Sequence, residues 1–195
     1  MQSSKRSRAY WARGLVTLCV ALALVVAASA RPAAAAPFAY VANFKSNTVS
    51  VIDTATNLLV ATVAVGFEPI AVAVTPDGAR AYVANEGDGT VSVLDTATNA
   101  VMVNISAAVG PSAAIAIAPD GQHAYVTGGS EVEGEGTVSV IATASNTVVA
   151  TVEVGLMPDG IAVTPDGQHV YVAIANTSFF GSGSVSVIAT ASNTV

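Results

Sequence analysis

GTVSVLDTATN, at residues 89–99, is the stretch that decides the fold, because the chain contains four close copies of it. The other copies span residues 47–57, 136–146 and 183–193, at intervals of 42, 47 and 47 residues. A Tyr-Val-Ala/Thr triplet begins at Tyr40 and recurs three times, and a Pro-Asp-Gly triplet recurs in the same order at residues 76–78, 119–121 and 165–167. A fixed period of this length is typical of repeat proteins, in which each repeat forms one supersecondary unit.

Each repeat predicts four short β-strands. In the second repeat, residues 70–75, 79–84, 90–94 and 101–105 are apolar runs separated by turn residues. The triplet Pro76-Asp77-Gly78 favours a tight turn, because proline presets φ, aspartate accepts backbone hydrogen bonds and glycine adopts left-handed backbone. In the strand at residues 91–94, Val-Ser-Val-Leu, large residues alternate with small ones and not with charged ones, so both faces of each sheet are expected to be covered. The sequence predicts an all-β fold, a β-propeller of four-stranded antiparallel blades.

Three stretches of the first repeat resemble the YVTN-repeat β-propeller family of secreted bacterial, surface-layer-associated proteins. They are YVAN at residues 40–43, NTVSVIDT at residues 47–54 and VAVGFEP at residues 63–69. The resemblance covers the chain from about residue 38 to its last residue. It implies kinship with seven-bladed propellers, which include surface-layer-associated proteins, lactonases and quinoprotein-like dehydrogenases. It implies a scaffold and leaves the reaction open, because one fold hosts many functions.

Residues 36–195 hold about 3.5–4 repeats of roughly 42 residues, so we predict a partial propeller. The first repeat lacks an opening strand, and Asn193 is followed by only two residues where Asn146 is followed by a further apolar run. Three interpretations follow: a fragment or truncated gene product, a dimer that completes a ring between two chains, and a strained four-bladed closure or open arc. Exposed strand edges and apolar faces would favour self-association.

Residues 1–35 are predicted to form a secretory signal peptide. Basic residues within positions 1–14 precede an apolar run of 14 residues, Leu15–Ala28, and a small-residue segment follows at residues 29–36. Cleavage after Ala35 fits best, with cleavage after Ala30 as the alternative. The run is shorter than the roughly 20 residues that span a bilayer, so an uncleaved membrane anchor is less favoured. The mature chain is expected to be extracellular, periplasmic or at the cell surface, without stable membrane insertion.

The charge of the predicted mature chain argues against two classes of partner. Only Lys45 and Arg80 remain as basic residues against thirteen acidic ones, a net charge of −11. Such a chain is expected to repel nucleic acids, whose binding relies on Lys and Arg at phosphates, and to avoid anionic membranes. The single cysteine, Cys19, lies in the predicted signal peptide, so disulfides are not expected to stabilise the fold.

The sequence contains no Gly-x-Ser-x-Gly elbow and no His-Glu-x-x-His motif, and it predicts no catalytic or cofactor-binding constellation. Glu131, Glu133 and Glu135 are weak candidates for a calcium site, since alternating carboxylates supply oxygen ligands. A solvated loop insertion is the favoured interpretation of that segment. His123 and His169 occupy one repeat position and could be metal ligands or general bases, but a surface position at a turn exit is favoured.

Other polar residues have structural explanations at this stage. Asp53 and Asp95 end a strand in two repeats and are expected to accept backbone hydrogen bonds in the next turn. The recurring tyrosines are expected to pack between blades. Glu68, Asp77 and Asp159 could gather at one mouth of the propeller, although their spacing does not require it.

These observations predict an exported propeller that acts as a binding or structural scaffold, without evident catalysis and without a cofactor. Its partner would be an unknown protein, small molecule or glycan, and a second copy could complete the ring. The alternative is a propeller enzyme such as a lactonase or quinoprotein-like dehydrogenase, whose acidic mouth would hold a divalent metal. That alternative rests on the resemblance alone.

Overall fold

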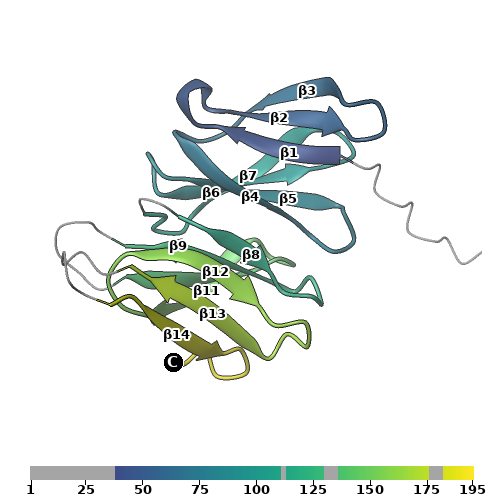
Figure 1. The fold of residues 1–195 in the computed structure, drawn as a ribbon. Helices are drawn as coiled ribbons and strands as arrows, with labels where there is room; N and C mark the ends of the chain where they lie inside the picture. The colour runs from purple at the N-terminus through teal and green to yellow at the C-terminus, as the bar shows by residue number, and fades with distance from the viewer. Residues whose placement is uncertain (1–37, 111–112, 130–135, 176–181) are drawn as a thin grey trace, which may run out of the picture. The chain divides into compact units, whose positions relative to one another are not determined.

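The computed structural model describes residues 38–110, 113–129, 136–175 and 182–195 (Figure 1). These residues form fourteen β-strands and one short 3-10 helix, η1 (Phe44–Ser46). The strands are β1 (Phe38–Asn43), β2 (Thr48–Asp53), β3 (Leu58–Ala64), β4 (Pro69–Val74), β5 (Arg80–Asn85), β6 (Thr90–Asp95), β7 (Ala100–Ser106), β8 (Ile115–Ile117), β9 (His123–Gly128), β10 (Thr137–Ala142), β11 (Thr147–Glu153), β12 (Pro158–Val163), β13 (His169–Ile174) and β14 (Ser184–Ala189). In the described ranges no helix is long and apolar enough to cross a membrane.

The strands form four antiparallel sheets in which chain neighbours pair with one another. Sheet I is β1–β3, sheet II is β4–β7, sheet III is β8–β11 and sheet IV is β12–β14. Sheets II and III contain the four strands predicted for a repeat. Within the described residues, sheet I begins with the repeat's second strand and sheet IV ends with its third. The prediction of an all-β fold built from propeller blades is confirmed.

The predicted turn chemistry is also confirmed. In the β4–β5 turn, Gly78 has a φ of 70° and its N–H donates to the Thr75 carbonyl at 2.7 Å. The Asp77 carboxylate accepts the Ala79 N–H at 3.0 Å and the Thr75 hydroxyl at 2.5 Å. The asparagine that closes each GTVSVLDTATN copy adopts left-handed backbone, with φ between 54° and 57°; these residues are Asn57, Asn99, Asn146 and Asn193. Both features explain why the strands reverse at these points.

Each sheet has two apolar faces with constant positions in the repeat. We call the face that carries Tyr82, Val91 and Val93 in sheet II the forward face; it packs against Ala124 and Ile141 of sheet III. The opposite, rear face of sheet II packs against Val49 and Val51 of sheet I. The forward face of sheet III packs in the same way on sheet IV; its members there are Tyr125, Val138 and Val140, against Val170, Val172 and Ile188. Consecutive sheets are therefore held together by one repeated apolar interface.

A β-bulge recurs in the last strand pair of sheets I, II and III. The extra residue is Val60, Met102 or Val149, and these three side chains are 50%, 51% and 54% exposed. A bulge leaves one residue unpaired and re-aims its side chain. Their exposure therefore follows from the bulge and does not mark a binding surface.

Candidate functional site at the loop edge

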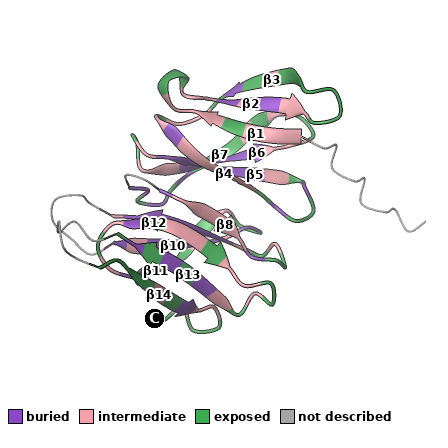
Figure 2. Cartoon of the chain, in the orientation of Figure 1, coloured by how far each residue is buried: buried purple, intermediate pink, exposed green. Residues whose placement is uncertain are grey.

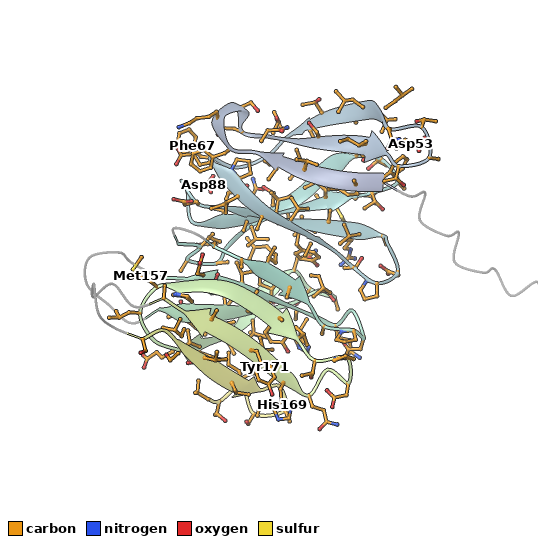
Figure 3. All side chains as sticks on the ribbon, in the orientation of Figure 1. Asp53, Phe67, Asp88, Met157, His169 and Tyr171 are labelled. Carbon is orange, nitrogen blue, oxygen red and sulfur yellow. The ribbon has the colours of Figure 1, made fainter. Side chains whose placement is uncertain are left out.

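Two loops of the repeat meet at one edge of sheets I and II, which we call the loop edge. The first is the connection Val65–Glu68, which leads from β3 into β4, and the second is the β5–β6 turn, Glu86–Gly89. The Phe67 carbonyl accepts the Gly87 N–H at 3.0 Å, and the Phe67 N–H donates to the Asp88 carboxylate at 2.9 Å. The Glu68 carbonyl accepts the Glu86 N–H at 3.0 Å. These bonds fix the backbone of both loops, and Figure 3 shows Phe67 beside Asp88.

A serine in the third strand of the repeat ties each of sheets II, III and IV to the connection that leaves the sheet before it. The Gly66 N–H donates to Ser92 Oγ at 3.2 Å, and Ser139 Oγ donates to the Ala107 carbonyl at 2.7 Å. Ser186 Oγ donates likewise to the Val154 carbonyl. The small polar residue in an otherwise apolar strand therefore satisfies a backbone group of the loop edge.

Residue 66 at the loop edge must be glycine, because a side chain at this position would collide with its neighbours. A Cβ at this position would lie 2.4 Å from Nδ2 of Asn85 and 2.8 Å from a carboxylate oxygen of Asp88. Asn85 is fully buried, and its Nδ2 donates to Thr90 Oγ1 at 3.0 Å and to Ser92 Oγ at 2.9 Å. Its Oδ1 has no hydrogen-bond partner. The loop is therefore packed directly onto a buried amide.

The functional groups of this edge are an exposed phenyl ring and two glutamates. Phe67 is 51% exposed, and Glu68 and Glu86 are half-buried. Both carboxylate oxygens of Asp88 accept hydrogen bonds within the protein. The second oxygen accepts the Thr90 hydroxyl at 2.6 Å and the Thr90 N–H at 3.2 Å. Here the structure brings together an apolar contact surface and acceptors suited to hydroxyl-bearing ligands.

The three carboxylates that could have gathered at one mouth are not all at this edge. Glu68 precedes β4 and Asp77 follows it, so a six-residue strand separates the two residues. Such a strand is about 20 Å long, which excludes a shared site. Asp159 is an exposed residue of β12, the strand of sheet IV that corresponds to β4.

The histidines lie where the turn-exit interpretation placed them. His123 and His169 are the first residues of β9 and β13, half-buried, and they pair across the sheet with Ala142 and Ala189. Arg80 has the same position in β5 and pairs with Asp95. Its Nη1 donates to the Thr143 carbonyl of sheet III, a contact between sheets that the sequence did not indicate.

The strand-ending aspartates act in the turns as expected. The Asp53 carboxylate accepts the Ala55 N–H at 2.7 Å, and the Asp95 carboxylate accepts the Thr98 N–H at 2.8 Å. Backbone and side-chain hydrogen bonds from Thr98 lower the pKa of Asp95. These carboxylates are therefore parts of the turn.

The tyrosines pack between sheets in the interior of the stack. Tyr82 is fully buried and Tyr125 is 2% exposed, and burial raises the pKa of both hydroxyls. The Tyr82 hydroxyl donates to Asn146 Oδ1 of sheet III at 2.8 Å. Tyr171 in sheet IV is the exception, at 46% exposed. The expectation of tyrosine packing thus holds where a following sheet is present.

Glu131, Glu133 and Glu135 lie outside the described residues, so the weak calcium-site prediction stays a prediction. Across the described ranges, no three His, Cys, Asp or Glu side chains lie close enough together to hold a metal ion.

The turn aspartates predict how stability depends on pH. Hydrogen bonds from Thr75 and the Ala79 N–H lower the pKa of Asp77, and hydrogen bonds from Thr164 and the Gln168 N–H lower that of Asp166. A lowered folded-state pKa stabilises the fold above the unfolded pKa, and this stabilisation is lost as the pH falls through the folded pKa. We expect urea unfolding to require less denaturant below about pH 4. The variant D77N/D166N should lose less stability between pH 5 and pH 3; an equal loss would contradict this assignment.

Comparisons with known proteins agree with the architecture. A family model described as "Lactonase, 7-bladed beta-propeller" matches residues 53–180. No curated protein sequence matches the chain. Among solved structures, hydrazine synthase of Kuenenia stuttgartiensis is 31% identical, with a TM-score of 0.73 over 80% of this chain and 44% of its own.

A second structure, of a protein from Bacteroides uniformis provisionally named 6-phosphogluconolactonase, is 19% identical. Its TM-score is 0.59 over 71% of this chain and 45% of its own, a likeness of fold alone. The chain therefore spans less than half the length of each of these two proteins.

Proposed function

The chain belongs to the lactonase family of seven-bladed β-propellers. We propose that it is an exported propeller module whose loop edge binds a ligand without transforming it. The observation that carries this proposal is that most of the described aspartates accept hydrogen bonds within the turns and loops of the fold. Six of them accept hydrogen bonds from neighbouring residues of the turns and loops; they are Asp53, Asp77, Asp88, Asp95, Asp120 and Asp166. Carboxylates held in this way build the scaffold and are poorly placed to act as general bases.

The loop edge supports a binding role. Phe67 presents half of its ring to solvent on a backbone that several hydrogen bonds hold in place. Aromatic rings on rigid loops contribute contact area at a small entropic cost, and the nearby Glu68 and Glu86 can accept hydroxyl donors. A hydroxyl-rich ligand such as a glycan fits this surface better than an anionic one, because the mature chain carries excess negative charge.

A glycan array probed with the purified protein tests this role. We expect binding to neutral glycans that is at least ~10-fold weaker in Phe67→Ser. Leu58→Ser is the matched control, because Leu58 is 63% exposed on β3 away from the loop edge. Glycan binding that is equal in Phe67→Ser and the wild type, or an array without any bound glycan, would overturn the proposal.

A lactonase activity is the second candidate, favoured by the family match. Proton release from glucono-δ-lactone and 6-phosphogluconolactone measures it directly. If the protein is a scaffold, we expect the lactones to open no faster with the protein than in buffer alone. Saturable hydrolysis that Glu68→Gln or Glu86→Gln abolishes, with the fold intact by circular dichroism, would replace the scaffold with an enzyme.

Export is a separate part of the proposal and rests on residues 1–35. Expression of the full chain in a bacterial host should give a mature protein that begins at Ala36, as N-terminal sequencing of the periplasmic and secreted fractions would reveal. A protein that keeps Met1 and stays in the cytoplasm would contradict export.

We also propose, from the repeats at residues 40–54, that the protein is of the surface-layer-associated YVTN type.

A further inference from the structure

An exposed aromatic ring and a carboxylate converge on one point of the loop edge. A Cβ at Gly87 would collide with Cδ1 of Phe67 and would lie 2.9 Å from Oε2 of Glu68. The edge of the ring and the carboxylate oxygen are therefore no more than ~5 Å apart, close enough for one cationic group to contact both. Figure 2 shows the two loops of this edge in the colours of exposed and intermediate residues, whereas most of β5 and β6 is buried.

Hydrogen bonds hold the backbone of this pair in place. The Glu68 N–H donates to Asn47 Oδ1 at 2.9 Å, and the Glu68 carbonyl accepts the Glu86 N–H at 3.0 Å. The Asp88 carboxylate accepts the Phe67 N–H at 2.9 Å and adds a second negative charge close to the loop. A ligand therefore meets a preorganised surface, which lowers the entropic cost of binding.

Both basic residues of the predicted mature chain have other contacts. Lys45 Nζ lies over the Phe44 ring, 5.1 Å from its centroid. Arg80 begins β5 and donates to sheet III, whereas the loop edge follows the other end of this six-residue strand, about 20 Å away. The charge of Glu68 is therefore left for a ligand to compensate.

We propose that the ligand of the loop edge carries a free amine beside its hydroxyl groups, as an amino sugar does. The ammonium group lies against the Phe67 ring, whose face attracts cations, and pairs with the Glu68 carboxylate. The negative charge of the predicted mature chain favours the approach of such a ligand. This inference rests on the proposed ligand-binding function and names the class of ligand that the loop edge selects.

Titration calorimetry with two oligosaccharides of equal length tests the inference. They are the tetramer of glucosamine, whose amines are charged at about pH 5.5, and the tetramer of N-acetylglucosamine, whose amides are neutral. We expect the wild type to bind the glucosamine tetramer at least ~10-fold more tightly than the acetylated one, and Glu68→Gln to lower this preference below ~2-fold. Glu153→Gln is the matched control, because it removes the same charge from an exposed residue of β11 in sheet III and should keep the preference. All three proteins should give the same circular dichroism spectrum.

The ratio of the two affinities separates this inference from the function on which it rests. Equal binding of both tetramers by the wild type, or a wild-type ratio in Glu68→Gln, would overturn the amine assignment and leave ligand binding at the loop edge intact. An equal loss of preference in Glu153→Gln would also overturn the assignment, because the net charge of the chain would then explain the preference. If neither tetramer binds but neutral glycans on the array do, the amine assignment alone is wrong. If no glycan binds in either experiment, the proposed function is wrong as well.

Discussion

Val93→Asp should destabilise the protein by roughly 3–5 kcal/mol. Val93 is fully buried in β6, on the forward face that packs against Ala124 and Ile141 of sheet III. A carboxylate there would be surrounded by apolar side chains and would have to ionise without a partner or remain protonated. Because domains are stable by about 5–15 kcal/mol, the variant should approach spontaneous unfolding. Urea titration followed by circular dichroism measures the loss.

Val149→Asp is the control for this prediction. It makes the same change of side chain in a strand of the next sheet, but at a bulge position that is 54% exposed. We expect it to change the free energy of unfolding by no more than about 0.5 kcal/mol. Similar losses in the two variants would mean that the forward and rear faces have been misassigned.

The fold could be read from the sequence because the repeat supplies the same information several times. One copy of GTVSVLDTATN leaves open which residues face which way, but four copies fix the strands and the turns between them. The Pro-Asp-Gly turns and the alternation of Val91, Ser92 and Val93 required only local physical chemistry. Local preference and repeated pattern agree here, which is the condition under which sequence arguments succeed.

The structural features that the sequence does not indicate depend on contacts between strands and between sheets. The bulges that expose Val60, Met102 and Val149 have no signature within those valine-rich strands. The donation from Ser139 to the Ala107 carbonyl joins residues 32 positions apart, and local propensity carries no trace of it. Repeat alignment could have suggested it, because a serine recurs in a strand where each neighbouring position is apolar.

The loop edge was predicted less well than the fold. The sequence allows Glu68 to share a mouth with Asp77, but the two residues lie at opposite ends of β4. The sequence does not identify Phe67 as a site residue, because an aromatic residue in a loop can be either buried or exposed. Its partner in the loop, Asp88, is 21 residues away in the sequence and accepts the Phe67 N–H at 2.9 Å. Sites formed by loops of different repeats depend on tertiary placement that residue spacing does not encode.

Tyr82→Ala should cost about 3–5 kcal/mol, whereas Tyr171→Ala should cost about 1 kcal/mol or less, although both residues begin the same Tyr-Val-Ala triplet. Tyr82 is fully buried between sheets II and III, so truncation leaves a cavity there and removes the hydrogen bond to Asn146. Tyr171 is 46% exposed, and its truncation opens no cavity in the isolated chain. Urea unfolding at protein concentrations where the chain is monomeric gives both values.

Tyr82→Phe divides the larger effect into its parts. It keeps the ring and removes only the hydroxyl that donates to Asn146 at 2.8 Å, so we expect a loss of about 1 kcal/mol. The remainder of the Tyr82→Ala effect then belongs to the packing of the ring between the two sheets. If Tyr82→Ala and Tyr171→Ala proved equally costly, the repeat position itself would determine the energy. If the two costs differ as expected, packing against the neighbouring sheet determines the energy, because stacked repeats are stabilised chiefly by the interfaces between neighbouring repeats.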